Sequence, residues 1–340
     1  MDPAGRRRIG RTGLEVSRLG FGAAALGNLY APVSDAAAAE AVAAACSAGI
    51  ALFDTAPFYG YGLSEERLGR ALRERPRASY VLSTKVGRLL VPRPPGSERD
   101  DGFVAAHPFD PVYDYSYDGV MRSVEESLRR LGCARIDVAL IHDVGALTHG
   151  ADAHAVFEAA LGGGYRALDE LRRAGDIAAV GLGVNEWEVC LEAMERGAFD
   201  CFLLAGRYTL LEQGALARLL PACEERGISV IVGGPYNSGI LASEPGPDSR
   251  YDYAPAGAEI LDRARRISAI CRSHQVPLQA AALQFPLLHP AVASVIPGAR
   301  SKAEVEENAA FVRHPLPPAL WEDLKRAGLL APNAPTRDDS

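Results

Sequence analysis

The feature that most constrains the fold is an alternation, repeated eight times, of a short apolar run with a longer segment of helical spacing. The candidate strands are Ser17–Ala24, Ala51–Ala56, Tyr80–Val86, Arg135–Asp143, Ala178–Val184, Cys201–Gly206, Ser229–Gly234 and Val292–Gly298. Near-continuous apolar strands that alternate with helices favour a parallel sheet covered by helices, which is an α/β fold. Eight such units that close on themselves predict a (β/α)8 TIM barrel.

The segments between these runs carry helix signals. Several of them follow a Ser that can cap the first helical turn. We expect helices to begin near Ser34, Ser64, Ser116, His154, Glu186, Glu212, Pro255 and Ser301. The alternative is a doubly wound dinucleotide-binding fold, which needs a G-x-G-x-x-G motif directly before its first helix. The sequence GFGAAALG moves the third glycine to Gly27, and a further loop, NLYAPVS, follows it, so the barrel is favoured.

The chain is longer than a plain barrel requires. Such a barrel takes about 250 residues, and this chain has 340. The surplus lies in an irregular loop at 87–116, a second loop at 236–255 and a C-terminal segment that adds a helix. Loops this long are commonly functional, and the aromatic residues in both predict lids over a binding mouth. We expect one domain over 1–333 and a polar tail over 334–340.

Composition narrows the classes of function. The net charge is −7, so no broad basic surface is expected for nucleic-acid binding. No apolar core follows the basic N-terminus, and the longest apolar stretch is interrupted by Glu40 and Gly49, which argues against a secretory signal and a membrane span. The six Cys residues form no C-x-x-C pair, which favours buried thiols over disulfides or metal ligands. We expect a cytoplasmic protein without a metal.

Four polar residues stand at or just beyond the ends of successive candidate strands: Asp54, Tyr59, Lys85 and His142. The carboxyl ends of barrel strands meet at one mouth, where active sites of this fold are built, so these side chains can converge. Each residue alone has a structural interpretation: a capping Asp, a packed Tyr, a solvated Lys or a core His. Their occurrence at adjacent strand ends favours a shared site.

These four residue types suit proton exchange with an oxygen atom. A buried Lys needs a carboxylate partner, which Asp54 can supply. The ammonium of Lys85 then favours the anionic form of Tyr59, whose ordinary pKa of about 10 suits it poorly for proton transfer at neutral pH. His142 can hydrogen-bond and orient the substrate oxygen. The set favours proton exchange at a carbonyl or hydroxyl oxygen while a hydride moves at the attached carbon.

Several motifs together resemble one family. GLEVSRLGFG, LFDTAPFYGYGLSEERLGRAL, STKVG, IHD, GVNEW and VIPGARSKAEVEEN are similar to the aldo-keto reductases, over nearly the whole chain. The resemblance implies a (β/α)8 barrel whose N-terminal hairpin, here RRRIGRTGLEVS, plugs the bottom. It also implies that Asp54, Tyr59, Lys85 and His142 form the catalytic tetrad, in which Asp54 polarises Lys85 and Tyr59 is the acid or base.

The resemblance further implies an extended nicotinamide dinucleotide across the barrel mouth. Asn185 matches the residue that holds the carboxamide, whereas the Ser and Gln that accompany it in the family are Val184 and Ala205 here. Gly233 aligns with the usual stacking aromatic, so Tyr236 is the candidate substitute. The other expected cofactor-binding residues are Gly22, Gly234, Pro235, Asn237, Ser238, Gly239, Pro297, Gly298, Ala299, Arg300, Glu304, Glu307 and Asn308.

Charge near the adenosine end favours NAD over NADP. Members of the family that prefer NADP commonly carry Lys directly after Ile-Pro and Arg six residues later, where this chain has Gly298 and Glu304. The Glu304 carboxylate would repel a phosphate that carries nearly two negative charges. Arg300 and Lys302 leave use of both cofactors open.

The long loop segments resemble the branch of the family that oxidises aldoses. They imply hydride transfer from the anomeric carbon of an aldose of the L-fucose or D-threo type to NAD, giving the lactone. A pyridoxal-oxidising branch is similar in the same regions, general aldehyde reduction uses the same tetrad, and a low-turnover nucleotide-sensing subunit is a further alternative. Candidate residues for substrate binding, all on loops expected near the mouth, are Tyr30, His107, Tyr113, Asp143 and His149.

Overall fold

The barrel strands occur where the sequence predicts them. The computed structural model describes residues 1–94, 99 and 101–337. Its main sheet has eight parallel strands with the neighbour order β14-β11-β10-β9-β8-β5-β4-β3. These strands are β3 (Phe21–Gly22), β4 (Leu52–Asp54), β5 (Val81–Val86), β8 (Val138–His142), β9 (Ala179–Val184), β10 (Cys201–Ala205), β11 (Ser229–Gly233) and β14 (Val292–Ile296).

Backbone hydrogen bonds close this sheet into a barrel. Gly20 N–H donates to Val295 O at 2.8 Å, and Val295 N–H donates to Arg18 O at 2.9 Å. Gly22 N–H donates to Pro297 O at 3.1 Å. The segments before and within β3 thus pair with β14, the other end of the strand order. The predicted (β/α)8 barrel is confirmed, and its closure leaves the sheet without a free edge.

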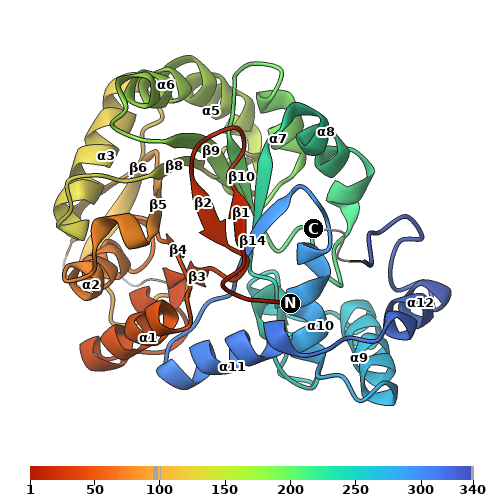
Figure 1. Cartoon of the computed structure of the whole chain (residues 1–340). Coiled ribbons are helices and arrows are strands. Elements are labelled where there is room, and N and C mark those ends of the chain that lie inside the picture. The colour runs from red at the N-terminus through yellow and green to blue at the C-terminus, as the bar shows by residue number, and fades with distance from the viewer. Residues whose placement is uncertain (95–98, 100, 338–340) are drawn as a thin grey trace.

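Helices surround the barrel (Figure 1). They are α1 (Asp35–Ser47), α2 (Leu63–Leu72), α3 (Tyr117–Leu131), α4 (Ala146–His149), α5 (Ala153–Ala159), α6 (Tyr165–Ala174), α7 (Glu188–Ala193), α8 (Leu219–Arg226), α9 (Ala258–Ser273), α10 (Leu278–Leu287), α11 (Lys302–Arg313) and α12 (Pro318–Arg326). The caps at Ser34, Ser116 and Ser301 are confirmed, because each side chain accepts a hydrogen bond from the N–H three residues later.

Two helix predictions need correction. The helix expected near Glu212 begins at Leu219, after a 3-10 turn at Gly214–Ala217. Helix α10 was not predicted, because all of its residues except Gln279 are buried and no polar face marks a helical period. Both errors arise where the apolar pattern of the sequence has no clear periodicity.

The N-terminal hairpin fills the bottom of the barrel, as expected. Strands β1 (Arg6–Arg8) and β2 (Glu15–Ser17) pair antiparallel and lie across the centre of the ring in Figure 1. Ile9 and Val16 are fully buried, in a cluster with residues near the start of barrel strands, including Leu52, Val138 and Cys201. A second, larger cluster lies between the sheet and the helices. The barrel interior is therefore a packed core at this end, and the site must lie at the other.

The two long loops are more regular than the sequence predicts. The segment at 87–116 contains a hairpin of β6 (Arg88–Pro92) and β7 (Phe109–Tyr113), and the segment at 236–255 contains β12 (Arg250–Tyr251) and β13 (Ala254–Pro255). Their Pro-rich and Gly-rich composition concealed these strands. In the segment expected to be a polar tail, Ala334 is 2% exposed and packs into the core, and residues 338–340 lie outside the described chain.

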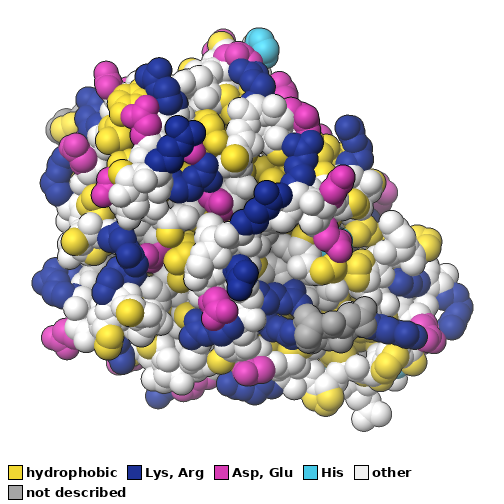
Figure 2. Space-filling model, turned by 45° about the horizontal axis from the view of Figure 1, so that its top comes forward, with side chains coloured by type: hydrophobic (Ala, Val, Ile, Leu, Met, Phe, Trp, Pro, Cys, Tyr) yellow, Lys and Arg dark blue, Asp and Glu magenta, His cyan; other side chains and the backbone are white. Residues whose placement is uncertain are grey.

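Charge is intermixed on the surface drawn in Figure 2, where basic and acidic side chains alternate over the face. In the described part of the chain, no helix has the length and apolar character needed to cross a membrane.

Candidate active site

Asp54 and Lys85 meet as a buried ion pair at the carboxyl end of the barrel. Asp54 ends β4 and Lys85 is the penultimate residue of β5, and the two residues are 2% and 1% exposed, respectively. Lys85 Nζ lies 2.6 Å from Asp54 Oδ2 and 2.9 Å from the carbonyl oxygen of Thr55. Ser83 donates to the other carboxylate oxygen at 2.8 Å. Burial opposes the charge of Lys85, but Asp54 and Tyr59 outweigh it and raise the pKa of Lys85, which is a cation at neutral pH.

The neighbouring strand leaves room for the long Lys85 side chain. Gly183 of β9 faces it, and a Cβ atom at Gly183 would lie 3.1 Å from Lys85 Cε. Any larger residue there would push the ammonium away from Asp54. The glycine in the GVNEW motif region thus has a packing role that its sequence context does not reveal.

Tyr59 approaches this pair from the loop after β4. The backbone of Tyr59 packs directly on Gly27, where a Cβ atom would lie 2.5 Å from the Tyr59 carbonyl carbon. Lys85 Nζ lies 4.8 Å from the centroid of the Tyr59 ring. Burial raises the pKa of the Tyr59 phenol, and the Lys85 ammonium, which lowers it, does not compensate. Lys85 therefore acts in the direction the sequence predicts, but desolvation dominates and the ligand-free phenol is protonated.

His142 completes the group at the end of β8. Its ring packs edge-on against Tyr59, with the centroids 6.2 Å apart. Burial, reinforced by the cations Arg88 and Lys85, holds the pKa of His142 well below its ordinary value. The imidazole is therefore neutral at physiological pH and can donate one hydrogen bond without carrying a charge.

One cavity of about 550 Å³ contains both Asp54 and Tyr59 and most of the residues expected to bind the cofactor. The expected residues that line it are Gly22, Gly234, Pro235, Tyr236, Asn237, Ser238, Gly239, Arg300, Gly298, Glu304, Glu307 and Asn308. Pro297, Ala299 and Asn185 are not among its lining residues. The sequence reasoning missed Ala24, Ala25, Leu29, Gln279 and Phe311, which also line it. These residues carry no motif, so only their position in the folded chain identifies them.

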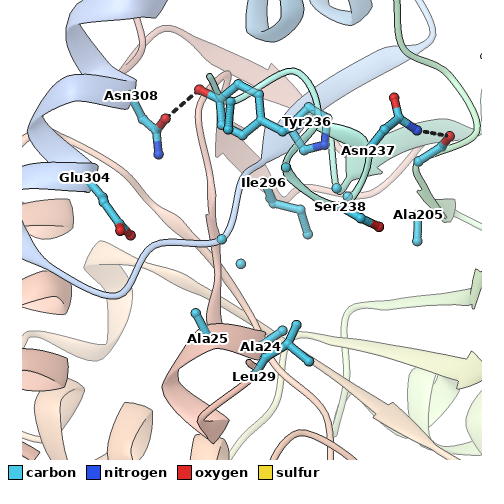
Figure 3. A pocket seen from close by; sticks show the side chains of 18 of the residues that line it. Ala24, Ala25, Leu29, Ala205, Tyr236, Asn237, Ser238, Ile296, Glu304 and Asn308 are labelled. Carbon is cyan, nitrogen blue, oxygen red and sulfur yellow. Dashed lines mark hydrogen bonds between the residues drawn. The ribbon is translucent and has the colours of Figure 1, made fainter. Parts of the chain in front are cut away.

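The loop after β11 forms one wall of this cavity (Figure 3). Tyr236 points toward α11, where its hydroxyl donates to Asn308 Oδ1 at 2.6 Å. Asn237 accepts from Thr209 at 2.6 Å and donates to the carbonyl oxygen of Gly206 at 3.0 Å. The Asn237 amide is thus used to hold the loop, and the Tyr236 ring lies toward the end of the cavity formed by α11 rather than toward Ala205 (Figure 3).

Glu304 is held in place at the start of α11. Its Oε2 accepts from the backbone N–H of Arg300 at 2.7 Å, and its Oε1 lies 3.2 Å from the Arg300 guanidinium. The Ser301 hydroxyl accepts from the Glu304 N–H at 3.3 Å and caps the first turn of α11, while the Glu304 side chain holds the N–H of Arg300, the residue before the cap. A carboxylate is thereby fixed at this end of the cavity.

The candidate substrate residues are not all at the cavity. Tyr30 lines it. Asp143 is buried and paired with Arg88, and His149 contacts the Asp143 carbonyl oxygen through Nε2 at 2.8 Å. Tyr113 is 44% exposed and packs edge-on against His149.

His107 lies apart from this group. Its Nε2 is 3.1 Å from Glu66 Oε2, and it does not line the cavity. In contrast, an aromatic residue of the first long loop does reach the candidate catalytic group: Phe103 contacts Phe58, Tyr59 and Tyr61, with ring centroids 5.4 to 6.3 Å away. This part of the loop covers the Tyr59 side of the mouth, as the lid prediction requires.

Comparisons with known proteins agree with this geometry. The model of the aldo/keto reductase family matches residues 18–328. The chain is 47% identical to pyridoxal 4-dehydrogenase from Microbacterium luteolum, over 96% of this chain and 98% of that protein. It is 41% identical to D-threo-aldose 1-dehydrogenase from a Pseudomonas species, over 94% of this chain and 96% of that protein.

A solved structure gives the same result at the level of the fold. An aldo-keto reductase from Bacillus halodurans, in its holo form, superposes with a TM-score of 0.73 and 26% sequence identity, covering 98% of this chain and 99% of that one. The match over most of the chain, together with the buried tetrad at the barrel mouth, shows that the protein is an oxidoreductase of the aldo/keto reductase family.

Proposed function

We propose that the protein oxidises the anomeric carbon of a cyclic aldose with NAD and releases the lactone. The observation that carries this proposal is that Asp54 and Tyr59 line the same cavity as the β11 loop and α11, with Lys85 and His142 packed against these two residues. A proton-exchange group and a dinucleotide-sized groove therefore share one space.

The residues of the cavity fit a nicotinamide dinucleotide. Gly22, Gly233, Gly234 and Gly298 line it without side chains, so a ligand can approach the backbone closely. Asn185 does not line the cavity, but its Oδ1 atom is buried without a hydrogen-bond partner, although buried acceptors are almost always paired. A carboxamide N–H2 group would satisfy it. When bound, the nicotinamide ring supplies the hydride acceptor.

The protein's own residues account for the proton. Tyr59, once deprotonated, takes the proton of the anomeric hydroxyl while the hydride leaves the same carbon, so that the C–OH group becomes the lactone carbonyl. Lys85, held by Asp54, stabilises the phenolate charge in the transition state. The neutral His142 donates a hydrogen bond to the substrate oxygen and orients it.

NAD preference is proposed on the position of Glu304. Its carboxylate is held at the α11 end of the cavity by the backbone N–H and the guanidinium of Arg300. A phosphate on the adenosine ribose would bring nearly two further negative charges to this end. The guanidinium of Arg300, which could attract such a phosphate, is instead paired with Glu304.

Pyridoxal is the second candidate substrate, because the relative that oxidises pyridoxal is 47% identical over nearly the whole chain. The two candidates share one chemistry. Pyridoxal carries a hydroxymethyl group beside its aldehyde and closes to a cyclic hemiacetal, as aldoses do. In both cases a ring C–OH carbon would lose a hydride and become a lactone carbonyl.

The test is the rate of NADH appearance with purified protein, NAD or NADP, and a panel of L-fucose, D-arabinose, L-galactose and pyridoxal. We expect turnover of a sugar with NAD, and loss of that turnover in Tyr59→Phe with NAD binding retained. Turnover of pyridoxal alone would replace the aldose by the second candidate. Unchanged turnover in Tyr59→Phe would refute the proton-transfer mechanism, and an efficiency at least about tenfold higher with NADP would refute the cofactor preference.

A further inference from the structure

A buried polar network adjoins the tetrad and has unpaired atoms. Arg88, at the start of β6, is 4% exposed and lies 2.5 Å from Asp143 Oδ2. Its guanidinium also stacks 4.3 Å above the Phe58 ring. Among the described residues, the buried side-chain atoms without a hydrogen-bond partner include Arg88 Nε, His142 Nδ1 and Asn185 Oδ1, all in this network. Unpaired buried polar atoms are rare, so their concentration beside a catalytic group indicates a functional constraint.

Asp143 is the centre of this network, and its backbone is held from several sides. Its φ of 40° lies in the left-handed region, which costs an L-residue about 1–2 kcal/mol. Its N–H donates to Gly183 O at 2.9 Å, and its carbonyl oxygen accepts from Tyr115 at 3.0 Å and His149 at 2.8 Å. A strained conformation that so many contacts maintain is typical of functional sites.

The Asp143 carboxylate contacts two residues of the proposed site. Its Oδ1 accepts a hydrogen bond from Asn185 Nδ2 at 3.2 Å, and its Oδ2 lies 3.4 Å from His142 Nε2. A carboxylate paired with Arg88 only accepts hydrogen bonds. The Asn185 amide must therefore turn its N–H2 group toward Asp143, which leaves Oδ1 as the free atom.

The Asp143 carboxylate, which only accepts hydrogen bonds, also determines the tautomer of His142. Its Nδ1 has no hydrogen-bond partner, whereas its Nε2 lies 3.4 Å from an acceptor, Oδ2 of Asp143. The single proton of the neutral ring is therefore stabilised on Nε2. At 3.4 Å the contact is too long to be a strong hydrogen bond, so this proton remains available to a substrate oxygen.

We propose that Asp143 is a positioning residue that acts through Asn185 and His142. It orients the Asn185 amide so that Oδ1 can accept from the cofactor carboxamide, and it keeps the proton of His142 on Nε2 for the substrate. Arg88 supplies the counter-charge that allows the carboxylate to remain buried. This role replaces direct substrate contact as the function of Asp143, and it rests on the proposed function, because it assumes a nicotinamide ligand.

The variant Asp143→Asn tests the first half of the proposal. The carboxylate of Asp143 has two oxygen atoms, whereas the amide of the variant has one. The charged Arg88 needs an acceptor, so this one oxygen atom should face Arg88. The new N–H2 group would then face Asn185, whose amide must reverse and present N–H2 to the cofactor carboxamide. We expect the Kd for NADH to rise at least about tenfold, whereas the Kd for ADP-ribose, which lacks nicotinamide, changes less than about twofold.

Two further variants control this measurement. Asp169→Asn alters another Arg-paired carboxylate that is also 8% exposed, but in α6 outside the cavity, and should change neither Kd. In an Asn185→Ala background, Asp143→Asn should have no further effect on NADH binding, because the amide through which it acts is gone. Equal weakening of NADH and ADP-ribose by Asp143→Asn, or unchanged NADH binding, would overturn the proposal.

The proposed protonation of His142 is tested on the unmodified protein, so this test is valid whether or not a variant folds. Long-range proton–nitrogen NMR correlations of the imidazole should show His142 protonated on Nε2. Protonation on Nδ1 would overturn the inference. The proposed function fails separately: wild-type protein that binds no NADH refutes both, whereas wild-type binding with an unaffected Asp143→Asn variant refutes only the role of Asp143.

Discussion

At the scale of single residues, we expect the protonation of Tyr59 to govern how the activity responds to pH. Burial raises the pKa of the phenol despite the nearby Lys85 ammonium. Oxidation needs the phenolate as a base, whereas reduction of a carbonyl needs the phenol as an acid. The pKa of His142 lies well below its ordinary value, so this residue stays neutral above neutral pH and adds no further change.

The rate of oxidation should therefore rise with pH. Below a raised phenol pKa, the phenolate fraction increases about tenfold per pH unit, so kcat/KM for oxidation should climb steadily between about pH 7 and pH 9.5. The reverse reduction should stay nearly constant over the same range. Initial rates in both directions measure this, with protein stability checked at each pH. A flat oxidation profile would contradict the assignment of Tyr59 as the base.

At the scale of elements, α11 carries the charge that we propose selects the cofactor. Glu304 accepts from the N–H of Arg300, just before this helix, and lines the cavity, so its carboxylate has both a structural and an electrostatic effect. The variant Glu304→Gln retains an oxygen for the Arg300 N–H but removes the charge. We expect NADP to bind at least about fivefold more tightly while NAD binding stays within about twofold.

A matched substitution separates the effect of the Glu304 charge at the cavity from the effect of the total charge of the protein. Glu306→Gln alters an exposed carboxylate of the same helix that pairs with Lys302 and does not line the cavity. It should change neither affinity. Isothermal titration with NAD and NADP gives all the values, and an equal gain in NADP affinity from both variants would show that Glu304 has no specific role.

The N-terminal hairpin stabilises the barrel but lies away from the chemistry. Ile9 is fully buried among residues at the start of the barrel strands, opposite the end that holds Asp54 and Lys85. Ile9→Ala should lower the free energy of unfolding by about 2–5 kcal/mol, because it removes buried methyl groups and leaves a cavity. The kcat should stay unchanged.

Urea unfolding measures the effect on the hairpin. Glu15→Ala, on the exposed side of β2, is the control and should change stability by less than about 0.5 kcal/mol. A loss of kcat in folded Ile9→Ala, without loss of stability, would show that the hairpin contributes to the site instead.

At the scale of the whole molecule, the cavity joins segments that are far apart in the chain. It is lined by Gly22 from the first barrel strand, by Gly206 just after the sixth, and by Asn308 from α11. A ligand that bridges them should stabilise the entire fold. At a concentration of 100 times its Kd, NADH should add about 2.7 kcal/mol to the free energy of unfolding and raise the melting temperature by several degrees.

This stabilisation can be compared with that from a smaller ligand. AMP reaches fewer of the bridged segments, so its shift at the same concentration should be smaller. Differential scanning calorimetry provides the measurement. Absence of a shift with NADH, at a concentration that supports turnover, would contradict a cofactor bound across these segments.

Sequence alone determined the strand pattern and pointed to the four residues that the fold gathers at the barrel mouth. Apolar runs and Ser caps are local signals that can be read from the sequence. The carboxyl ends of parallel strands meet at one edge of the sheet, and this does not depend on the conformation of the loops. Asp54, Lys85 and His142 could therefore be expected to converge. The resemblance to a family supplied the assignment of Asn185 and Glu304.

Only the tertiary structure decided how these residues are tuned. The hairpin in 87–116, the direction of Tyr236, the Arg88–Asp143 pair and the net pKa of Tyr59 all depend on contacts between distant segments. Desolvation and the orientation of an amide are set by the atoms that packing brings around a group, and residue order does not encode them locally. The sequence thus specified which groups meet, and packing determined their protonation and the direction of their hydrogen bonds.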